Sequence, residues 1–167
     1  ADGANLKAAN AISGQILWTL SNVMENYVCP VYANEVLYFH SKNALRAVHA
    51  DTGQVAWTIP FTLPVAADGV GSLAVAYGAI FLAVWSGDNA HGEVRAYYAS
   101  NGEHLWTFED IALGMNRPIV ANRHVYAAGR FSNTIYALNP DTGNVEWQKT
   151  FPDYLAHPAV AEGRLFV

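Results

Sequence analysis

The sequence predicts an all-β fold made of repeated four-stranded units, and three observations support this prediction. A motif of alanine, five residues, glycine, three residues and tryptophan occurs four times. The motif tryptophans stand at positions 18, 57, 106 and 147, so they recur at intervals of 39, 49 and 41 residues. Apolar residues alternate on both sides of each motif, as the two-residue period of a β-strand requires.

Four copies of the motif share three fixed positions, and an aliphatic residue stands two positions before each alanine. Repeats of 20–50 residues are typical of solenoids, propellers and arrays. The repeated residues are Ala8, Ala47, Ala96 and Ala137, then Gly14, Gly53, Gly102 and Gly143, and finally Trp18, Trp57, Trp106 and Trp147.

Each copy of the motif predicts a β-hairpin. In the turns at 51–53 and 141–143, Asp-Thr-Gly, we expect the aspartate to accept hydrogen bonds from its own backbone and the glycine to supply a positive φ. A second pair of short strands precedes the hairpin, as in the segments 30–38, 118–126 and 158–166. A unit of four short antiparallel strands in about 40 residues is the blade of a β-propeller.

The stretches Ala-Val-His-Ala-Asp-Thr-Gly-Gln-Val-Ala-Trp (47–57) and Ala-Leu-Asn-Pro-Asp-Thr-Gly-Asn-Val-Glu-Trp (137–147) resemble the tryptophan-docking motif of the pyrroloquinoline-quinone-type propeller repeat family. The resemblance extends over essentially the whole chain. It implies that each motif tryptophan packs against the next blade near that blade's alanine and glycine, and it gives the twelve repeated residues a structural docking role. Burial of a tryptophan removes about 200 Å² from water, which would fasten neighbouring blades together.

The repeats divide the chain into blade units of about 21–59, 60–108, 109–149, and 150–167 joined with 1–20. The interval from position 147 through the end of the chain and back to position 18 matches an ordinary blade. We therefore expect four blade equivalents in a single propeller or half-propeller, with one blade split between the termini, which would protect its edge strands. Three arrangements stay open: a four-bladed ring, a homodimer that forms an eight-bladed ring, and part of a longer propeller.

Composition excludes several classes of protein. The formal net charge of -5 argues against a nucleic-acid partner, because phosphate binding needs a basic surface. The sequence contains no apolar run of about 18 residues, the length that a membrane span requires. Its first residues do not resemble a signal peptide. The single cysteine, Cys29, excludes an internal disulfide and a multi-cysteine metal site. The family resemblance implies a periplasmic or extracellular location.

The sequence predicts neither a catalytic nor a metal-binding residue. Its histidines form no zinc-binding pattern, and it contains no nucleophile elbow and no phosphate-binding loop. The long hairpin loop at 86–92 lacks the spaced acidic residues of a calcium loop. If a small ligand binds, we expect it at the face of the disc where the connections between blades gather. The candidate ligand-binding residues on those connections are Tyr27, Asp68, Arg117 and His157.

The predicted function is a non-catalytic binding or scaffold propeller without a cofactor, which contacts a protein partner or a small ligand through one face. This is the role of the outer-membrane assembly lipoproteins and sensor domains that the repeat resembles. One alternative is part of a quinoprotein dehydrogenase that holds pyrroloquinoline quinone and calcium. Dehydrogenases of that family place an adjacent Cys-Cys pair against the quinone, whereas this chain has only Cys29. A second alternative is a glycan-binding propeller, to which Trp85 and the many tyrosines point.

Overall fold

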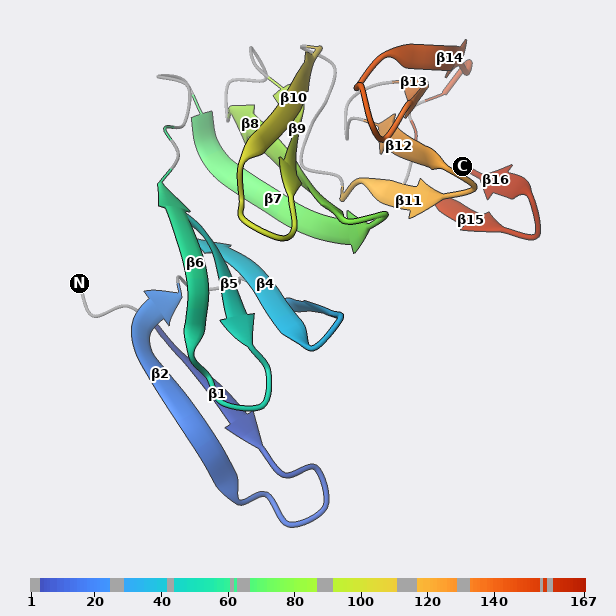
Figure 1. Cartoon of the computed structure of the whole chain (residues 1–167). Coiled ribbons are helices and arrows are strands. Elements are labelled where there is room, and N and C mark those ends of the chain that lie inside the picture. Colours follow the sequence, from blue (N-terminus) through green and yellow to red (C-terminus); the bar gives the residue numbers. More distant parts are fainter. Residues whose placement is uncertain are drawn as a thin grey trace. The chain divides into compact units, whose positions relative to one another are not determined.

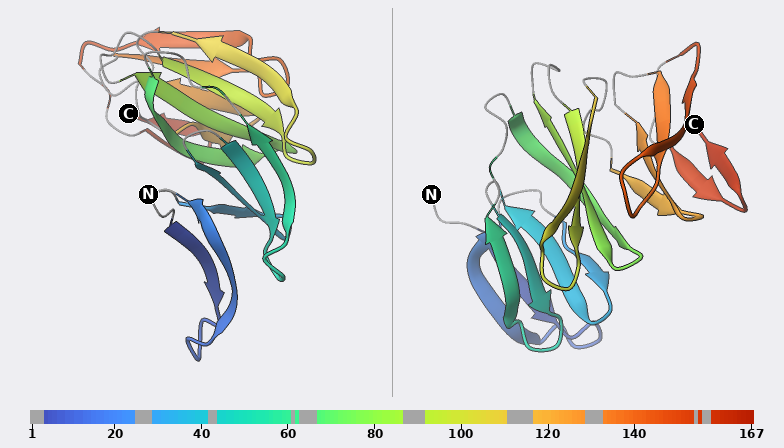
Figure 2. Two further views of the ribbon diagram at one scale, coloured as in Figure 1. Left: turned by 90° about the vertical axis from the view of Figure 1, so that its left-hand side faces the viewer. Right: turned by 45° about the horizontal axis from the view of Figure 1, so that its top comes forward.

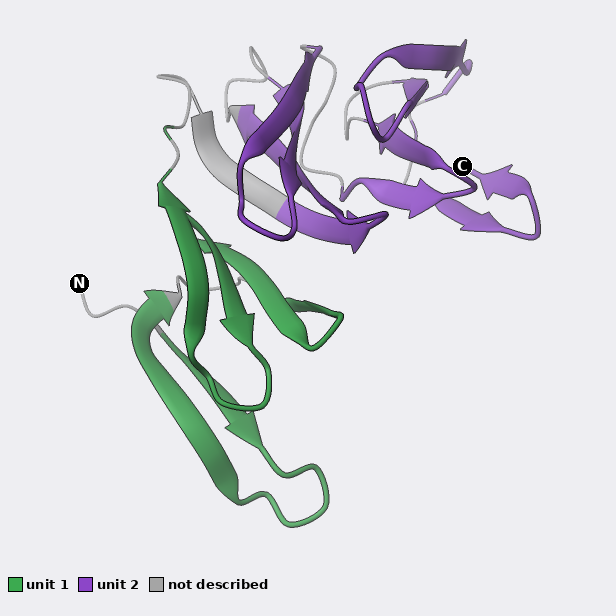
Figure 3. Ribbon diagram, viewed as in Figure 1, with its two compact units in different colours: residues 1–62 green, residues 63–167 purple. Residues whose placement is uncertain are grey.

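The computed structural model describes residues 4–24, 29–41, 44–60, 62, 67–86, 92–110, 117–128, 133–153, 155 and 158–167. Every regular element within these ranges is a β-strand, which confirms the predicted all-β class (Figure 1). The described part of the chain contains no helix that is long and apolar enough to cross a membrane. The chain divides into two compact units, residues 1–62 and 63–167 (Figure 3).

The first unit contains a two-stranded sheet followed by a four-stranded sheet, both antiparallel. The two-stranded sheet pairs β1 (Ala4–Ala9) with β2 (Ile16–Met24). The four-stranded sheet contains β3 (Val31–Ala33), β4 (Val36–Ser41), β5 (Ala44–His49) and β6 (Val55–Pro60) in sequence order.

The second unit contains two four-stranded sheets and a two-stranded sheet, again antiparallel. The first sheet is formed by β7 (Ala67–Ala76), β8 (Ala79–Ser86), β9 (Gly92–Tyr98) and β10 (His104–Glu109). The second is formed by β11 (Ile119–Ala121), β12 (His124–Ala128), β13 (Thr134–Leu138) and β14 (Val145–Thr150). The last pairs β15 (Ala159–Ala161) with β16 (Arg164–Phe166).

Each complete sheet is a meander in which every strand pairs with its neighbours along the chain, as a propeller blade requires. The sheets have the twist that side-chain sterics impose on β-strands (Figure 2). The three four-stranded sheets extend over 31–60, 67–109 and 119–150, and the division of the chain into blade units at 21–59, 60–108 and 109–149 stays a prediction. The pairing of 150–167 with 1–20 would join the two units and stays a prediction.

Within each unit the sheets bury apolar side chains against one another. In the first unit, Leu6 of β1 packs with Phe39 and Val48 of the four-stranded sheet. In the second unit, Phe81 and Trp106 pack with Val125 and Leu138 of the next sheet. The following interface contains Ile135, Ala137 and Leu155, with Val160 and Leu165 of the two-stranded sheet partly buried against them. Burial of these faces is the main stabilising contribution within each unit.

The β3–β4, β7–β8, β11–β12 and β15–β16 turns each have two residues with positive φ, the backbone of a type I′ hairpin turn. The turn residues are Asn34 and Glu35, Tyr77 and Gly78, Asn122 and Arg123, and Glu162 and Gly163. Asparagine and glycine adopt this conformation readily, but tyrosine and arginine do so only where the surrounding structure holds them. Tyr77 and Arg123 are therefore unusual residues for their positions.

The motif hairpins share one loop geometry. In each, the amide of the motif glycine donates to the carbonyl oxygen four residues earlier, as from Gly143 to Asn139, 2.9 Å, and the glycine φ is positive. The expectation that Asp141 accepts hydrogen bonds from its own turn is wrong. The Asn139 side chain accepts from the amides of Asp141 and Thr142, at 2.9 and 3.1 Å. Asn139 lies two and three residues before these amides, so its side-chain oxygen can reach both N–H groups.

Candidate functional site

Trp18 contacts the motif hairpin of the following repeat in the first unit. The tryptophan lies on β2 opposite Ala8, and its indole N–H donates to the carbonyl oxygen of Ala50, 3.0 Å away. A Cβ atom placed on Gly53 would lie 2.7 Å from the indole ring. The ring therefore occupies space that only glycine leaves open, and its polar atom has a partner, as a buried indole N–H requires.

Trp106 repeats this arrangement in the second unit. The tryptophan lies on β10 opposite Ala96, and its indole N–H donates to the carbonyl oxygen of Pro140 at 2.9 Å. A Cβ atom on Gly143 would lie 2.6 Å from the ring. Trp106 is only 7% exposed. Both carbonyl acceptors stand three positions before the glycine, so the two contacts are equivalent within the repeat.

The other two motif tryptophans lie opposite their alanines, Trp57 opposite Ala47 and Trp147 opposite Ala137. Trp57 is partly buried, whereas Trp147 is 38% exposed. Of the remaining glycines, Gly14 and Gly102 have positive φ, and a Cβ atom on Gly14 would meet open space. The docking role of all twelve motif residues stays a prediction, which the contacts of Trp18 and Trp106 support.

The four predicted ligand-binding residues lie only partly within the described residues. Tyr27 and His157 lie outside the described residues. Asp68 belongs to β7, in a part of the strand where only the backbone is described. Arg117 precedes β11 and is exposed. A ligand site on these connections therefore stays a prediction.

Asp110, on the same set of connections, accepts a hydrogen bond from the phenol of Tyr136. Burial, together with the hydrogen bond to Asp110 and the charge of that carboxylate, raises the pKa of Tyr136 to about 12. Because the two residues belong to neighbouring sheets of the second unit, this bond joins the end of β10 to β13. Among the described residues, no three His, Cys, Asp or Glu side chains gather into a group that could hold a metal ion.

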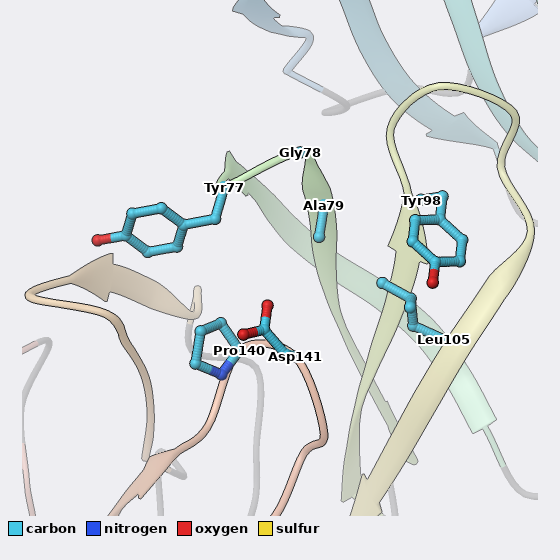
Figure 4. A pocket seen from close by; sticks show the side chains of 7 residues that line it. All are labelled: Tyr77, Gly78, Ala79, Tyr98, Leu105, Pro140 and Asp141. Carbon is cyan, nitrogen blue, oxygen red and sulfur yellow. The ribbon is translucent and has the colours of Figure 1, made fainter.

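The described part of the second unit has a small pocket at the opposite end of the sheets, among the turns (Figure 4). We call it the turn-tip pocket. Its volume is about 100 Å³, and it is lined by Tyr77, Gly78, Ala79, Tyr98, Leu105, Pro140 and Asp141. Figure 4 shows that the β7–β8 turn and the β9–β10 hairpin contribute the tyrosines, and that the β13–β14 loop contributes the carboxylate.

Arg123 connects the two sides of the turn-tip pocket. Its backbone amide donates to the phenol oxygen of Tyr77 at 3.0 Å, and its guanidinium lies 5.4 Å from the centre of that ring. The guanidinium also donates to Asp141 Oδ2 at 3.0 Å. The side chains of Arg123 and Asp141 are 68% and 63% exposed, so solvent reaches both members of the pair. The pocket thus combines aromatic faces with an accessible carboxylate.

Beside this pocket, His124 bridges two strands of the same sheet. Its Nε2 lies 2.7 Å from Glu146 Oε2, and its Nδ1 lies 2.7 Å from the carbonyl oxygen of Asn122. The other oxygen of Glu146 accepts from the Asn139 side chain at 2.8 Å. Both ring nitrogens of His124 therefore face hydrogen-bond acceptors. This cluster holds the turn tips of the last complete sheet.

Sequence reasoning missed the turn-tip pocket because it depends on residues from three separate turns. Tyr77 and Arg123 stand 46 positions apart, and nothing in their local sequence predicts that they meet. One signal was present. An aligned comparison of the repeats places Tyr77 where the other copies have Asn34, Asn122 and Glu162. A bulky aromatic residue at a turn position with positive φ indicates a departure from the scaffold.

The chain matches the family model described as outer membrane protein assembly factor BamB over residues 2–112 and again over residues 90–167. A BamB from Yersinia pestis is 28% identical over 158 residues, which cover 85% of this chain and 38% of that protein. A BamB from Bordetella pertussis is 32% identical over 104 residues, which cover 60% of this chain and 25% of that protein. The chain therefore spans about two fifths or less of the length of these relatives.

A solved structure, the quinohemoprotein alcohol dehydrogenase ADHIIG from Pseudomonas putida, matches 99% of this chain and 35% of its own with a TM-score of 0.70 and 17% identity. At that identity the likeness shows the fold alone. The matches agree with the repeated motif and the four-stranded antiparallel sheets. The chain belongs to the family of outer membrane protein assembly factor BamB, whose pyrroloquinoline-quinone-type repeats form β-propeller blades.

Proposed function

We propose that this protein is a non-catalytic β-propeller scaffold that contacts other proteins during outer-membrane protein assembly, in the periplasm and without a cofactor. The observation that carries the proposal is the match to the BamB family model over both 2–112 and 90–167. The two BamB relatives are named for the same assembly role. The proposed partners are proteins rather than nucleic acids, since the formal net charge of -5 opposes phosphate binding.

The geometry of the turn tips supports a binding role. Backbone hydrogen bonds of 2.8–2.9 Å fix the main chain of each motif hairpin, so the loop is formed before a partner arrives. Preorganised contact residues lower the entropy lost on binding. Tyr77 and Tyr98 are each 47% exposed at these tips, and tyrosine is enriched in protein interfaces. We propose the turn tips of the second unit as a contact surface of the scaffold.

Site-specific photocrosslinking in cells tests this proposal. A photoreactive residue replaces Tyr98 at the turn tips, and another replaces Lys149, an exposed residue in the last strand of its sheet, as the control. The protein is exported to the periplasm of a Gram-negative host, and the crosslinked products are identified by mass spectrometry. We expect envelope proteins to be captured at position 98 in preference to position 149. Absence of protein adducts at position 98 would contradict the scaffold surface.

A redox assay tests the proposal that the protein works without pyrroloquinoline quinone. Purified protein is supplied with pyrroloquinoline quinone, calcium, an alcohol and an artificial electron acceptor. We expect no dye reduction above a heat-killed control, because the chain has no adjacent Cys-Cys pair. Dye reduction that requires the quinone would favour the dehydrogenase alternative over the scaffold.

A further inference from the structure

We propose that the turn-tip pocket binds the side chain of an arginine or lysine from a protein partner. This inference rests on the proposed scaffold function, since it names the chemistry by which one of the scaffold's surfaces recognises a partner. It concerns a site within the second unit that is built by the β7–β8 turn, the β9–β10 hairpin and the β13–β14 loop (Figure 4).

The size of the pocket favours a single side chain. A volume of about 100 Å³ is well below the roughly 300–1,000 Å³ of pockets that enclose a drug-sized ligand. The lining includes the apolar atoms of Ala79, Leu105 and Pro140. This apolar lining can pack against the methylene groups of a long basic side chain, whose charged end stays near water.

The polar groups at the rim suit a cation. Asp141 accepts from Arg123 through Oδ2, and within the described part of the chain its Oδ1 has no hydrogen-bond partner. A carboxylate has acceptor sites on both oxygens, so Oδ1 can receive a second cationic donor. The Tyr98 hydroxyl likewise has no hydrogen-bond partner among the described residues, and the ring is 47% exposed. Tyrosine faces attract guanidinium and ammonium groups.

Arg123 shows the same chemistry within the chain. Its guanidinium lies 5.4 Å from the centre of the Tyr77 ring and donates to Asp141 at 3.0 Å. Both Tyr77 and Arg123 hold this arrangement from positions with φ of 52° and 58°. These values belong to the type I′ turns of the scaffold, so both side chains project from backbone that the fold fixes. A partner's basic side chain would add to an arrangement that the fold already stabilises.

The charged side chains on the described turns of the second unit are on balance acidic. The acidic side chains at the turn tips of the second unit are Glu103, Asp141, Glu146 and Glu162, and the arginines there are Arg123 and Arg164. Acidic groups therefore outnumber arginines in the described turns. An acidic surface raises the local concentration of a basic partner and speeds its association.

Nuclear magnetic resonance with a matched pair of peptides tests the proposal. The full chain, labelled with ¹⁵N, is titrated with acetyl-Gly-Arg-Gly-amide and with the same peptide carrying citrulline, which has the shape of arginine without its charge. We expect saturable shifts of the amides at 77–79, 98–105 and 141 with the arginine peptide. The citrulline peptide should bind about tenfold more weakly, the effect of one lost charge-assisted hydrogen bond.

Two variants locate the binding. Asp141→Asn should weaken the arginine peptide about tenfold, and Tyr98→Ala should weaken both peptides. Asp153→Asn, a second exposed aspartate in the same unit, is the control and should leave binding unchanged. The backbone of the 139–144 hairpin is held by Asn139 and by main-chain bonds, so Asp141→Asn leaves the fold intact, as the unchanged spectrum away from the pocket would show.

Three outcomes would overturn the proposal. Equal binding of the arginine and citrulline peptides would show that charge plays no part. Shifts confined to other surfaces would place the site elsewhere. Stronger shifts of the same amides with a methyl hexoside than with the arginine peptide would assign the pocket to a glycan. The photocrosslinking experiment is independent of all three, since it scores capture of any protein at position 98, whatever the chemistry of recognition.

Discussion

Trp106 and Pro140 are joined by a hydrogen bond of 2.9 Å from the indole N–H to the carbonyl oxygen, and this bond spans two sheets of the second unit. The equivalent bond in the first unit joins Trp18 to Ala50 at 3.0 Å. In both places the ring lies where a glycine leaves space for it. The repeat thus couples one residue on the last strand of a sheet to the loop of the following sheet.

Replacement of Gly143 by alanine should destabilise the protein by about 2–5 kcal/mol. The new Cβ would lie 2.6 Å from the Trp106 ring, so the cost of overpacking adds to that of a positive φ. Gly163→Ala is a matched control, because its φ is also positive but its Cβ would meet open space. That variant should lose about 1–2 kcal/mol from φ alone. Equal losses in urea unfolding would show that the tryptophan contact is not tight.

Replacement of Trp106 by alanine should cost about 3–5 kcal/mol, the range for removal of a large buried aromatic side chain. The ring is 7% exposed and packs in the cluster with Phe81 and Leu138. Trp147→Ala should cost less, because that ring is 38% exposed. Urea unfolding followed by circular dichroism measures both losses. A loss at position 106 no larger than at position 147 would contradict the docking role of Trp106.

Tyr136 should make the folded protein lose stability as the pH rises from 10 towards 12. Burial raises the pKa of the phenol from 10.0 to about 12 in the folded state. In this window the unfolded chain has lost the proton and the folded chain retains it, so rising pH favours unfolding. Below pH 10 the contribution is fully present. Thermal unfolding across this range should show a shallower alkaline decline in Tyr136→Phe than in the parent protein.

The ultraviolet titration of tyrosinate checks the same assignment. Tyr136 should ionise late in the titration, because its pKa is raised to about 12. Tyr136→Phe should remove a late step from the titration without changing the early ones. If the late step persists in the variant, the raised pKa belongs to a different tyrosine, and burial also raises the pKa of Tyr38 and Tyr97.

Removal of the His124 side chain should have a small effect on stability. Its bonds to Glu146 and to the Asn122 carbonyl are short, but solvent reaches both His124 and Glu146. Ion pairs in contact with water contribute about 0–1 kcal/mol. A double-mutant cycle of His124→Ala and Glu146→Gln should therefore give a coupling energy of about 0.5–1 kcal/mol. A coupling energy near zero would mean that the His124–Glu146 contact orients the two side chains without stabilising the fold.

The sequence by itself determined the features that depend on neighbours within one repeat. The motif spacing predicted the all-β class, the four-stranded sheets and the positive φ of Gly53 and Gly143, because hairpin turns are closed by residues about five positions apart. Alternation of apolar residues predicted the strands for the same reason. The prediction for the hydrogen bonds of the 141–143 turn was wrong, because the Asn139 side chain and not that of Asp141 accepts hydrogen bonds from the turn's backbone amides.

Only the tertiary structure decided where separate turns meet. The contacts of Tyr77, Arg123 and Asp141 join three loops that are far apart in the sequence. Their approach depends on the stacking and twist of two sheets, which no short-range pattern encodes. The predicted ligand face lies on connecting segments, and since Tyr27 and His157 fall outside the described residues, that site stays a prediction. A periodic sequence determines the repeated unit, while a binding site arises from how neighbouring units are packed.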